Sequence, residues 1–404
     1  MPSLIQINSG INWGSTGRIA EQINMKAASQ GWKVFFVYGQ SKNPSRSVEI
    51  HIGNLISHAF ALVEARLFDN VGLSNRLATK KLIRKIKKIG PDIIHLHNLH
   101  GYYINYRILF EFLNSTNIPV VWTLHDCWSF TGHCAHFVSA KCEKWRVECN
   151  DCPLRREYPS SLVFDRSNRN YTLKKQLFTQ NRNLHIVAVS QWLADLCRES
   201  FLKDIDIRVI KNGVDLDLFN RKDVNTLIGG DNHKYRVLGV SSVWNAAKGI
   251  EDFIRLRKLL DSRQYEIILI GLTEQQIRKM PKGIVGISRT NSIKELVQYY
   301  SSANVFVNPT YCDTFPTTNI EALACGTPVV TYRTGGSPEA IDCETGFVVE
   351  QGDICGLSDC IIKICTSSRE KYYDVCRKRA ETYFNKDVRF SEYLKLYNDL
   401  LQKQ

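Results

Sequence analysis

Residues 305–341 have the sequence VFVNPTYCDTFPTTNIEALACGTPVVTYRTGGSPEAI, and this stretch decides the fold. An apolar segment ends at Asn308, a loop carries Asp313, and a helical pattern carries Glu321 before Gly326 stops it. A second apolar segment, PVVTY, begins directly afterwards. Strand, loop, helix and strand in this order predict two parallel strands joined by a right-handed crossover.

The same alternation continues through most of the chain. Short apolar segments alternate with helical patterns, which is typical of buried parallel sheets. One barrel or two open sheets could each hold roughly ten such strands. A polar stretch with Gly229 and Gly230, followed by a fresh strand–loop–helix unit, favours two doubly wound domains with a ligand cleft at the carboxyl ends of their strands. The apolar segments are LIQINS, KVFFVY, DIIHLH, VVWTLH, HIVAVS, RVLGVS, EIILIG, VFVNP and PVVTY.

This pattern predicts an N-terminal domain over 1–211, a C-terminal domain over 212–385, and a last helix over 386–404 that packs back on the N-terminal domain. Residues 126–165 break the alternation, because they are rich in cysteine and aromatic residues and have no clear period. A connection of this length in a compact domain is usually functional or is ordered by something other than a core.

Composition narrows the function classes. The chain has 404 residues, 44% of them hydrophobic, with no signal-like N-terminus and no apolar stretch approaching the ~20 residues that span a bilayer, so we expect a cytoplasmic protein. The formal net charge is +13, and the densest basic segment is 80–88. Its helical spacing predicts a solvated surface helix or a contact with an anionic membrane. No aromatic-basic motif favours nucleic acid as a partner.

Two segments place candidate ligand-binding residues after predicted strands. Gly14 and Gly17 flank Ser15, where glycines allow close approach of the backbone and a helix N-terminus offers N–H groups to an anion. The alternative is a tight turn with a Ser or Thr cap. His125 and Asp126 end the strand VVWTLHD, which should face the ligand crevice, although a structural histidine would fit there equally.

The 305–341 stretch resembles the E-x7-E motif of retaining GT-B glycosyltransferases of family 4. The typical pattern is E-x-F-G-x-x-x-x-E-A-x-A-x-G-x-P-V, and residues 313–329 are DTFPTTNIEALACGTPV. Further segments match the family in the right order, so that the resemblance covers essentially the whole chain except 126–165. These segments are GSTGR, TLHD, VIKNGVDLDLF, VLGVSSVWNAAKGIEDFIRL, TGGSPEAI and ETGFVV.

The resemblance implies two facing Rossmann-like domains with a cleft between them, and a role for each matching residue. Glu321 would hold the ribose of a nucleotide-sugar donor, with a capping box from Thr318 as the alternative. Lys248 would neutralise the donor diphosphate, unless it only forms a surface salt bridge. His125, Asp313 and Lys248 are the implied catalytic residues. Donor-binding residues would also include Gly14, Ser15, Gly17, Thr314, Phe315 and Thr317.

Two positions depart from the family pattern. Asp313 replaces the first Glu and is one methylene shorter, and Val243 stands where an Arg often precedes the Lys, unless Arg333 or Arg18 substitutes for it. The D-x-D strings at 204–206 and 215–217 look like loop and linker residues, so we expect no catalytic metal. Fixed cations and helix N-termini would then stabilise the leaving diphosphate. The resemblance implies retention of anomeric configuration.

The expected activity is sugar transfer from a nucleotide-diphosphate sugar to a glycan in bacterial surface polysaccharide biosynthesis. A lipid-linked acceptor at the inner membrane face fits the basic segment 80–88. The alternatives are a nucleotide-sugar-modifying enzyme such as an epimerase, which would need no acceptor, and a nonenzymatic nucleotide-sugar-binding protein.

Thirteen cysteines in a chain expected to remain reduced point to thiols or a metal site, not to a disulfide framework. Cys134, Cys142, Cys149 and Cys152 have the spacing C-x7-C-x6-C-x2-C and predict a structural zinc site, with His133 and His136 as possible substitutes. The alternative is that these cysteines are small buried apolar residues.

Overall fold

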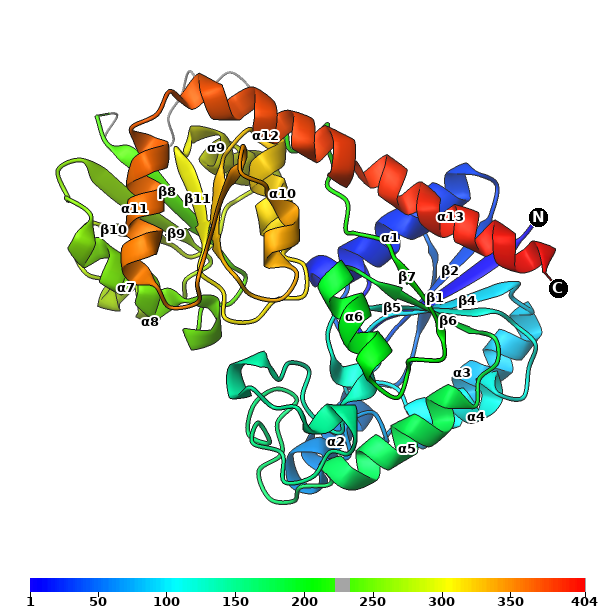
Figure 1. Ribbon diagram of the computed structural model, residues 1–404. Helices are drawn as coiled ribbons and strands as arrows, with labels where there is room; N and C mark the ends of the chain where they lie inside the picture. Colours follow the sequence, from blue (N-terminus) through cyan, green and yellow to red (C-terminus); the bar gives the residue numbers. More distant parts are fainter. Residues whose placement is uncertain (222–232, 404) are drawn as a thin grey trace. The chain divides into compact units, whose positions relative to one another are not determined.

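The computed structural model describes residues 1–221 and 233–403, and the chain divides into two compact units (Figure 1). The N-terminal domain comprises Met1–Lys211 and Arg389–Gln404, and the C-terminal domain comprises Asn212–Val388. The stretch with Gly229 and Gly230 lies outside the described residues. Each domain has its own parallel sheet, which confirms two Rossmann-like domains and excludes the single barrel.

The N-terminal domain is built on a seven-stranded parallel sheet with the order β3-β2-β1-β4-β5-β6-β7. Its central strands are almost completely buried, as expected for a sheet covered on both faces. The strands are β1 (Ser3–Ile7), β2 (Lys33–Tyr38), β3 (Val48–His51), β4 (Ile93–Leu96), β5 (Val120–Leu124), β6 (Leu184–Ala188) and β7 (Asp206–Val209). The helices are α1 (Gly14–Ser29), α2 (Leu55–Phe68), α3 (Arg76–Ile89), α4 (Tyr106–Leu113), α5 (Ser167–Thr179) and α6 (Gln191–Glu199).

The C-terminal domain repeats the architecture with six parallel strands in the order β10-β9-β8-β11-β12-β13. Its strands are β8 (Tyr235–Val240), β9 (Tyr265–Ile270), β10 (Ile284–Ile287), β11 (Val305–Asn308), β12 (Val329–Tyr332) and β13 (Gly346–Val349). Its helices are α7 (Ile250–Leu259), α8 (Glu274–Lys279), α9 (Ile293–Ser302), α10 (Thr317–Ala324), α11 (Ile354–Cys365) and α12 (Arg369–Phe384). Short one-turn helices are η4 (Ala246–Lys248) and η5 (Ser337–Ala340).

The last helix, α13 (Lys386–Gln402), buries its apolar side in the core of the N-terminal domain from Arg389 onward. Phe390, Tyr393 and Tyr397 pack there with residues of β1 and β4. The hydroxyl of Tyr397 also hydrogen-bonds Nδ1 of His95 at 2.6 Å. Apolar burial and a buried polar contact therefore both fix this helix to the sheet.

The segment 126–165 contains only the one-turn helices η1 (Trp128–Phe130), η2 (Val138–Ala140) and η3 (Lys144–Arg146). It nevertheless has a small aromatic core, since Phe130, Phe137 and Trp145 are almost fully buried and the Phe137 and Trp145 rings stack at 4.8 Å between centroids. The insert is therefore compact although it lacks longer helices and strands.

In each sheet the strand order reverses once, between β1 and β4 and between β8 and β11. Loops that follow the strands beside such a switch point diverge and leave a crevice at the carboxyl ends, where open α/β sheets bind ligands. The loops after β1, β4, β8 and β11 therefore frame the places where a site is expected.

Candidate functional site

The loop after β8 and the loop after β11 meet through an ion pair. Lys248 Nζ lies 2.7 Å from Asp313 Oδ2 and 3.4 Å from the Cys312 carbonyl oxygen. Burial acts to lower the pKa of Lys248, but the neighbouring Asp313 carboxylate outweighs it and raises that pKa. Lys248 is thus a cation whose charge is already partly neutralised.

Backbone geometry holds Lys248 in this position. The Asn245 side chain accepts a hydrogen bond from the Lys248 amide at 3.1 Å. Gly249 follows with φ of 72°, and a Cβ there would stand 2.3 Å from the Pro309 carbonyl oxygen. Only glycine permits both the left-handed conformation and this approach of the two loops.

Glu321 lies on α10, directly after the loop that carries Asp313. Its carboxylate accepts a hydrogen bond from the Tyr300 hydroxyl at 3.0 Å, a partner that the sequence analysis missed. Pro316 precedes the first turn of α10 and no side chain caps it, so the capping box from Thr318 is not formed. Glu321 therefore lies beyond the first turn, and its role is not that of a cap.

The remaining predicted residues of this domain are closely packed. Thr314 and Phe315 are buried, and the Phe315 amide donates to Asp313 Oδ1 at 3.2 Å. Thr317 is the first residue of α10, where the helix N-terminus leaves backbone N–H groups for an anion. Arg333, one of the suggested substitutes for the missing arginine, pairs instead with Glu350 at 2.6 Å.

In the N-terminal domain, α1 begins after β1 without a side-chain cap, so the alternative of a Ser or Thr cap is not formed. Ser15 is exposed in the first turn. Gly14 has φ of 64°, and a Cβ on Gly17 would stand 2.8 Å from the Gly10 carbonyl oxygen. Gly14 is therefore favoured by its left-handed backbone conformation, and Gly17 by the close approach of the Gly10 carbonyl. The start of the helix is open to an anionic group.

A chain of hydrogen bonds leads from Gln6 on β1 to His125 at the end of β5. Gln6 Nε2 donates to Asn24 Oδ1 at 2.7 Å and to the Ala20 carbonyl, which leaves Gln6 Oε1 to accept from His97 Nε2 at 2.6 Å. His97 Nδ1 must then be the acceptor toward His125 Nε2 at 3.0 Å. The network therefore requires a proton on Nε2 of His125.

Burial sets the charge state of these histidines. It lowers the pKa of His125 to about 4, and it lowers the pKa values of His95 and His97 well below the ordinary value. At neutral pH these three rings are uncharged. His125 can therefore orient a ligand through hydrogen bonds, but it does not bring a positive charge to the site.

Beside His125, the Asp126 carboxylate lies 2.7 Å from His100 Nε2, and His100 Nδ1 lies 3.0 Å from the Tyr158 hydroxyl. Burial opposes ionisation of Asp126, yet the interaction with His100 and the Trp128 amide hold its pKa well below the usual range. Because Tyr158 belongs to the 126–165 segment, this contact ties the insert to the end of β5.

The predicted zinc ligands Cys134, Cys142, Cys149 and Cys152 all line one small cavity in the insert. Throughout residues 1–221 and 233–403, no three His, Cys, Asp or Glu side chains stand together as ligands of one metal ion. All thirteen cysteines are free thiols.

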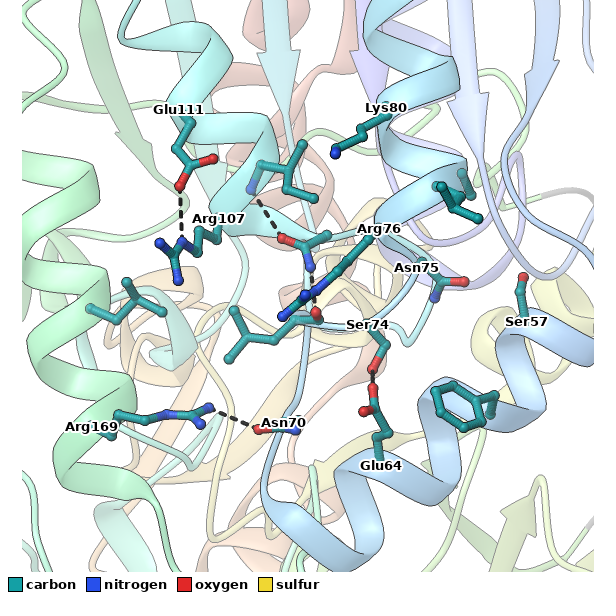
Figure 2. A pocket seen from close by; sticks show the side chains of 17 residues that line it. Ser57, Glu64, Asn70, Ser74, Asn75, Arg76, Lys80, Arg107, Glu111 and Arg169 are labelled. Atoms are coloured by element: carbon teal, nitrogen blue, oxygen red, sulfur yellow. Dashed lines mark hydrogen bonds and ion pairs between the residues drawn. The ribbon is translucent and has the colours of Figure 1, made fainter.

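A larger cavity of about 1000 Å³ lies among α2, α3, α4 and α5 (Figure 2). Glu111 pairs with Arg107 at 2.9 Å and Arg169 donates to Asn70 at 2.8 Å, so these groups are engaged. The apolar side chains on the wall are Phe60, Leu73, Leu77, Ala78, Ile108 and Leu173. Cationic side chains on its wall are Arg76, Lys80, Arg107 and Arg169. No helix in the described part of the chain is long and apolar enough to cross a membrane.

The predicted catalytic and donor-binding residues thus fall into two groups, one near the switch point of each domain, whereas the predicted zinc ligands lie in the insert. Sequence reasoning missed Gln6, His97, His100 and Tyr300, which orient the predicted residues. The motif HLHNLH at the end of β4 was the available signal for the two histidines, whereas nothing local marks Gln6 or Tyr300.

Comparison with known proteins assigns both domains. Residues 17–218 match the model of Glycosyltransferase Family 4, and residues 234–367 match that of Glycosyl transferases group 1. The chain is 30% identical over 233 residues to the putative colanic acid biosynthesis glycosyl transferase WcaC of Escherichia coli, covering 53% of this chain and 55% of that protein. It is 30% identical over 167 residues to the capsular polysaccharide biosynthesis glycosyltransferase CapM of Staphylococcus aureus, covering 39% and 44%.

The matched region thus spans about half the length of these curated relatives. Among solved structures, sucrose-phosphate synthase from Thermosynechococcus elongatus superposes with a TM-score of 0.77 at 19% identity over 100% of both chains, and so shows the same GT-B fold. With half of the chain matched by one family model and the E-x7-E region placed at a switch point, the chain belongs to glycosyltransferase family 4.

Proposed function

We propose that the protein transfers a sugar from a nucleoside-diphosphate sugar to a glycan acceptor in bacterial surface polysaccharide biosynthesis. The observation that carries the proposal is the joining of Lys248, Asp313 and the start of α10 at the β8/β11 switch point. A cation, a carboxylate and an uncapped helix N-terminus are suited to a diphosphate that bears a sugar. The names of the two curated relatives support the pathway.

In this proposal the C-terminal domain holds the donor. Glu321, aimed by Tyr300, accepts hydrogen bonds from the two ribose hydroxyls. Lys248 turns from Asp313 toward the diphosphate, and Asp313 is then available to a sugar hydroxyl. The N–H groups at the start of α10 add to the stabilisation of the departing phosphate charge.

We further propose retention of anomeric configuration without a catalytic metal. Lys248 and helix N-termini supply the positive charge that the leaving group needs. Burial keeps His125 neutral, so it orients the sugar and does not serve as a general acid at neutral pH. The acceptor hydroxyl would pass its proton to the donor phosphate.

The acceptor is proposed to be lipid-linked and reached at an anionic membrane surface. Helix α3 carries seven basic residues and no acidic residue in 14 positions. Helix α2 buries only Ala61 and Ala65 and leaves Leu55 and Ile56 more than 80% exposed. The cavity is lined by both apolar and basic side chains (Figure 2). This combination is suited to a membrane leaflet, which has an apolar interior and an anionic surface.

Vesicle sedimentation tests the membrane part. The protein should bind vesicles that contain phosphatidylglycerol but not pure phosphatidylcholine, and salt should weaken binding, because each Lys or Arg contributes about 1 kcal/mol. Lys81→Gln with Lys85→Gln and Leu55→Ser with Ile56→Ser should each reduce binding, whereas the control Lys258→Gln with Lys279→Gln should not. Absence of binding to either vesicle at low salt would exclude the surface.

A nucleotide-sugar screen with and without a lipid-linked glycan tests the transfer itself. Lys248→Met should lower kcat/KM about 100-fold, while Arg333→Gln should leave it unchanged. Conversion of the donor to a new sugar nucleotide without acceptor would favour the epimerase alternative. Donor binding without turnover under all acceptors would favour the binding-protein alternative.

A further inference from the structure

The insert encloses a cavity of about 10 Å³, which is about the space of one water molecule or one ion. The four predicted ligands Cys134, Cys142, Cys149 and Cys152 line it. These residues are 18 positions apart at most, in a segment whose regular structure consists of one-turn helices. The fold has therefore brought the four cysteines to the wall of one ion-sized space, although within residues 1–221 and 233–403 no three such side chains are already placed as ligands of one ion.

The thiols interact with one another and with backbone N–H groups. Cys134 hydrogen-bonds Cys152, and Cys149 interacts electrostatically with Cys142 and Cys152. The Gly132 amide donates to the Cys149 sulfur, and the Leu154 amide donates to the Cys152 sulfur. Such N–H donors are the outer partners expected of a thiolate metal site.

A buried cation lies beside the cluster. Lys174 is only 1% exposed, and its ammonium donates to the carbonyl oxygens of Trp128 at 2.7 Å and Thr131 at 2.9 Å. Within the described residues it forms no ion pair, although buried charges are normally paired. Burial lowers the pKa of Lys174 to about 7, and the groups that favour its charged form are Cys149, Asp69, Cys134 and Asp126. A negatively charged thiolate cluster would add to the counter-charge of these two carboxylates.

One buried polar atom on the same cavity also lacks a partner. His133 Nδ1 lies 2.6 Å from Asp69 Oδ1, while His133 Nε2 is buried and has no hydrogen-bond partner in the described structure. His133 lines the cavity and interacts electrostatically with Cys152. In the imidazolium form, which donates from Nδ1 to Asp69, Nε2 also carries a proton, and a Cys152 thiolate would give it the acceptor that it lacks.

We propose that the insert binds one structural zinc ion through the thiolates of Cys134, Cys142, Cys149 and Cys152. Four thiolates on a divalent ion leave a charge of −2, which the Lys174 ammonium offsets in part. Coordination needs side-chain rotations that bring the sulfurs to about 2.3 Å from the metal. Soft thiolates in tetrahedral number favour zinc over calcium or magnesium.

The site would order the part of the insert that contacts the end of β5. Tyr158 follows Cys152 by six residues, and its hydroxyl reaches His100, which pairs with Asp126 beside His125. Loss of zinc should therefore loosen the Tyr158–His100–Asp126 contact. This inference rests on the insert and its neighbours Lys174 and Asp69, and it holds whether or not the proposed transferase activity is correct.

Elemental analysis of the purified full-length chain should find about one equivalent of zinc. Cys142→Ser and Cys149→Ser should each reduce it below about a tenth of an equivalent, whereas the exposed control cysteines Cys343→Ser and Cys355→Ser should leave it unchanged. Lys174→Met should keep the site but weaken zinc about tenfold, as lost outer-shell partners do.

Cobalt provides a measurement that does not depend on the variants folding. Co²⁺ added to the chelator-treated wild-type chain should give the charge-transfer absorption of tetrahedral thiolate coordination, and zinc should abolish it. Less than about a tenth of an equivalent of zinc, with no such absorption, would overturn the proposal. Zinc kept by Cys134→Ser but lost by His133→Gln would overturn the assignment of Cys134.

Discussion

Acidification should destabilise the N-terminal domain through its buried histidines. The pKa of His125 falls from the ordinary value to about 4 on burial, so the folded domain holds the ring neutral while the unfolded chain protonates it. A group with this depressed pKa contributes stability above about pH 6.5 and loses it as the pH falls toward about 4. His95 and His97 change in the same direction, because burial lowers both pKa values.

The magnitude follows from the two pKa values of His125. Between about pH 7.5 and about pH 5 its contribution to the free energy of unfolding falls by about 2 kcal/mol. His125→Gln removes this titration while keeping an N–H donor for His97 Nδ1. The variant should therefore lose about 2 kcal/mol less than the wild type over the same interval.

Urea unfolding followed by tryptophan fluorescence measures this domain selectively. Six of the seven tryptophans belong to the N-terminal domain, and Trp244 is the one in the C-terminal domain. The midpoint at about pH 5 should be clearly lower than at about pH 7.5. Equal stability at the two pH values, or the same loss in His125→Gln as in the wild type, would refute the assignment of a neutral buried His125.

Three further predictions concern single contacts. Tyr397→Phe should lower the free energy of unfolding of the N-terminal domain by about 1–3 kcal/mol, because it leaves His95 Nδ1 buried without its partner. The exposed control Tyr383→Phe should change this free energy little, and urea denaturation compares the two variants. Glu321→Gln should lower kcat/KM about 100-fold and Tyr300→Phe only about tenfold, because Tyr300 acts by orienting the Glu321 carboxylate. Equal effects of the two substitutions in steady-state kinetics would contradict this order. Gly17→Ala should destabilise the start of α1 by about 1–3 kcal/mol, because the added methyl group would collide with the Gly10 carbonyl oxygen, whereas Ser15→Ala should not. Thermal unfolding of both variants measures this difference.

The two-domain fold could be predicted because each half of the chain repeats strand, loop and helix with turn residues in between. The strands that the apolar pattern missed are β3, β7, β10 and β13. All four lie at the edges of their sheets, and β3, β7 and β10 have mostly exposed or half-buried residues, so they lack the continuous apolar signal of a central strand. Their position in the sheet, and not their composition, makes them strands.

The candidate site likewise has residues that local motifs predicted and partners that they did not. Glu321, Lys248 and the Gly14–Gly17 loop were identified from local motifs, whereas the pairing of Lys248 with Asp313 joins residues 65 positions apart. Gln6 and His97 are separated by 91 positions and meet because β1 and β4 are neighbours in the sheet. Local patterns carry no information about such partners.

The sequence alone determined the alternation of strands and helices, the motifs at the strand ends and the cysteine spacing, because these depend on residues close together in the chain. Tertiary structure decided which charged groups pair and which groups carry protons. The examples are the Lys248–Asp313 ion pair, the protonation of His125 and the buried Lys174 beside the thiols. Protonation state depends on burial and on neighbours that only the folded sheet brings together, so this part of the chemistry could not be obtained from sequence order.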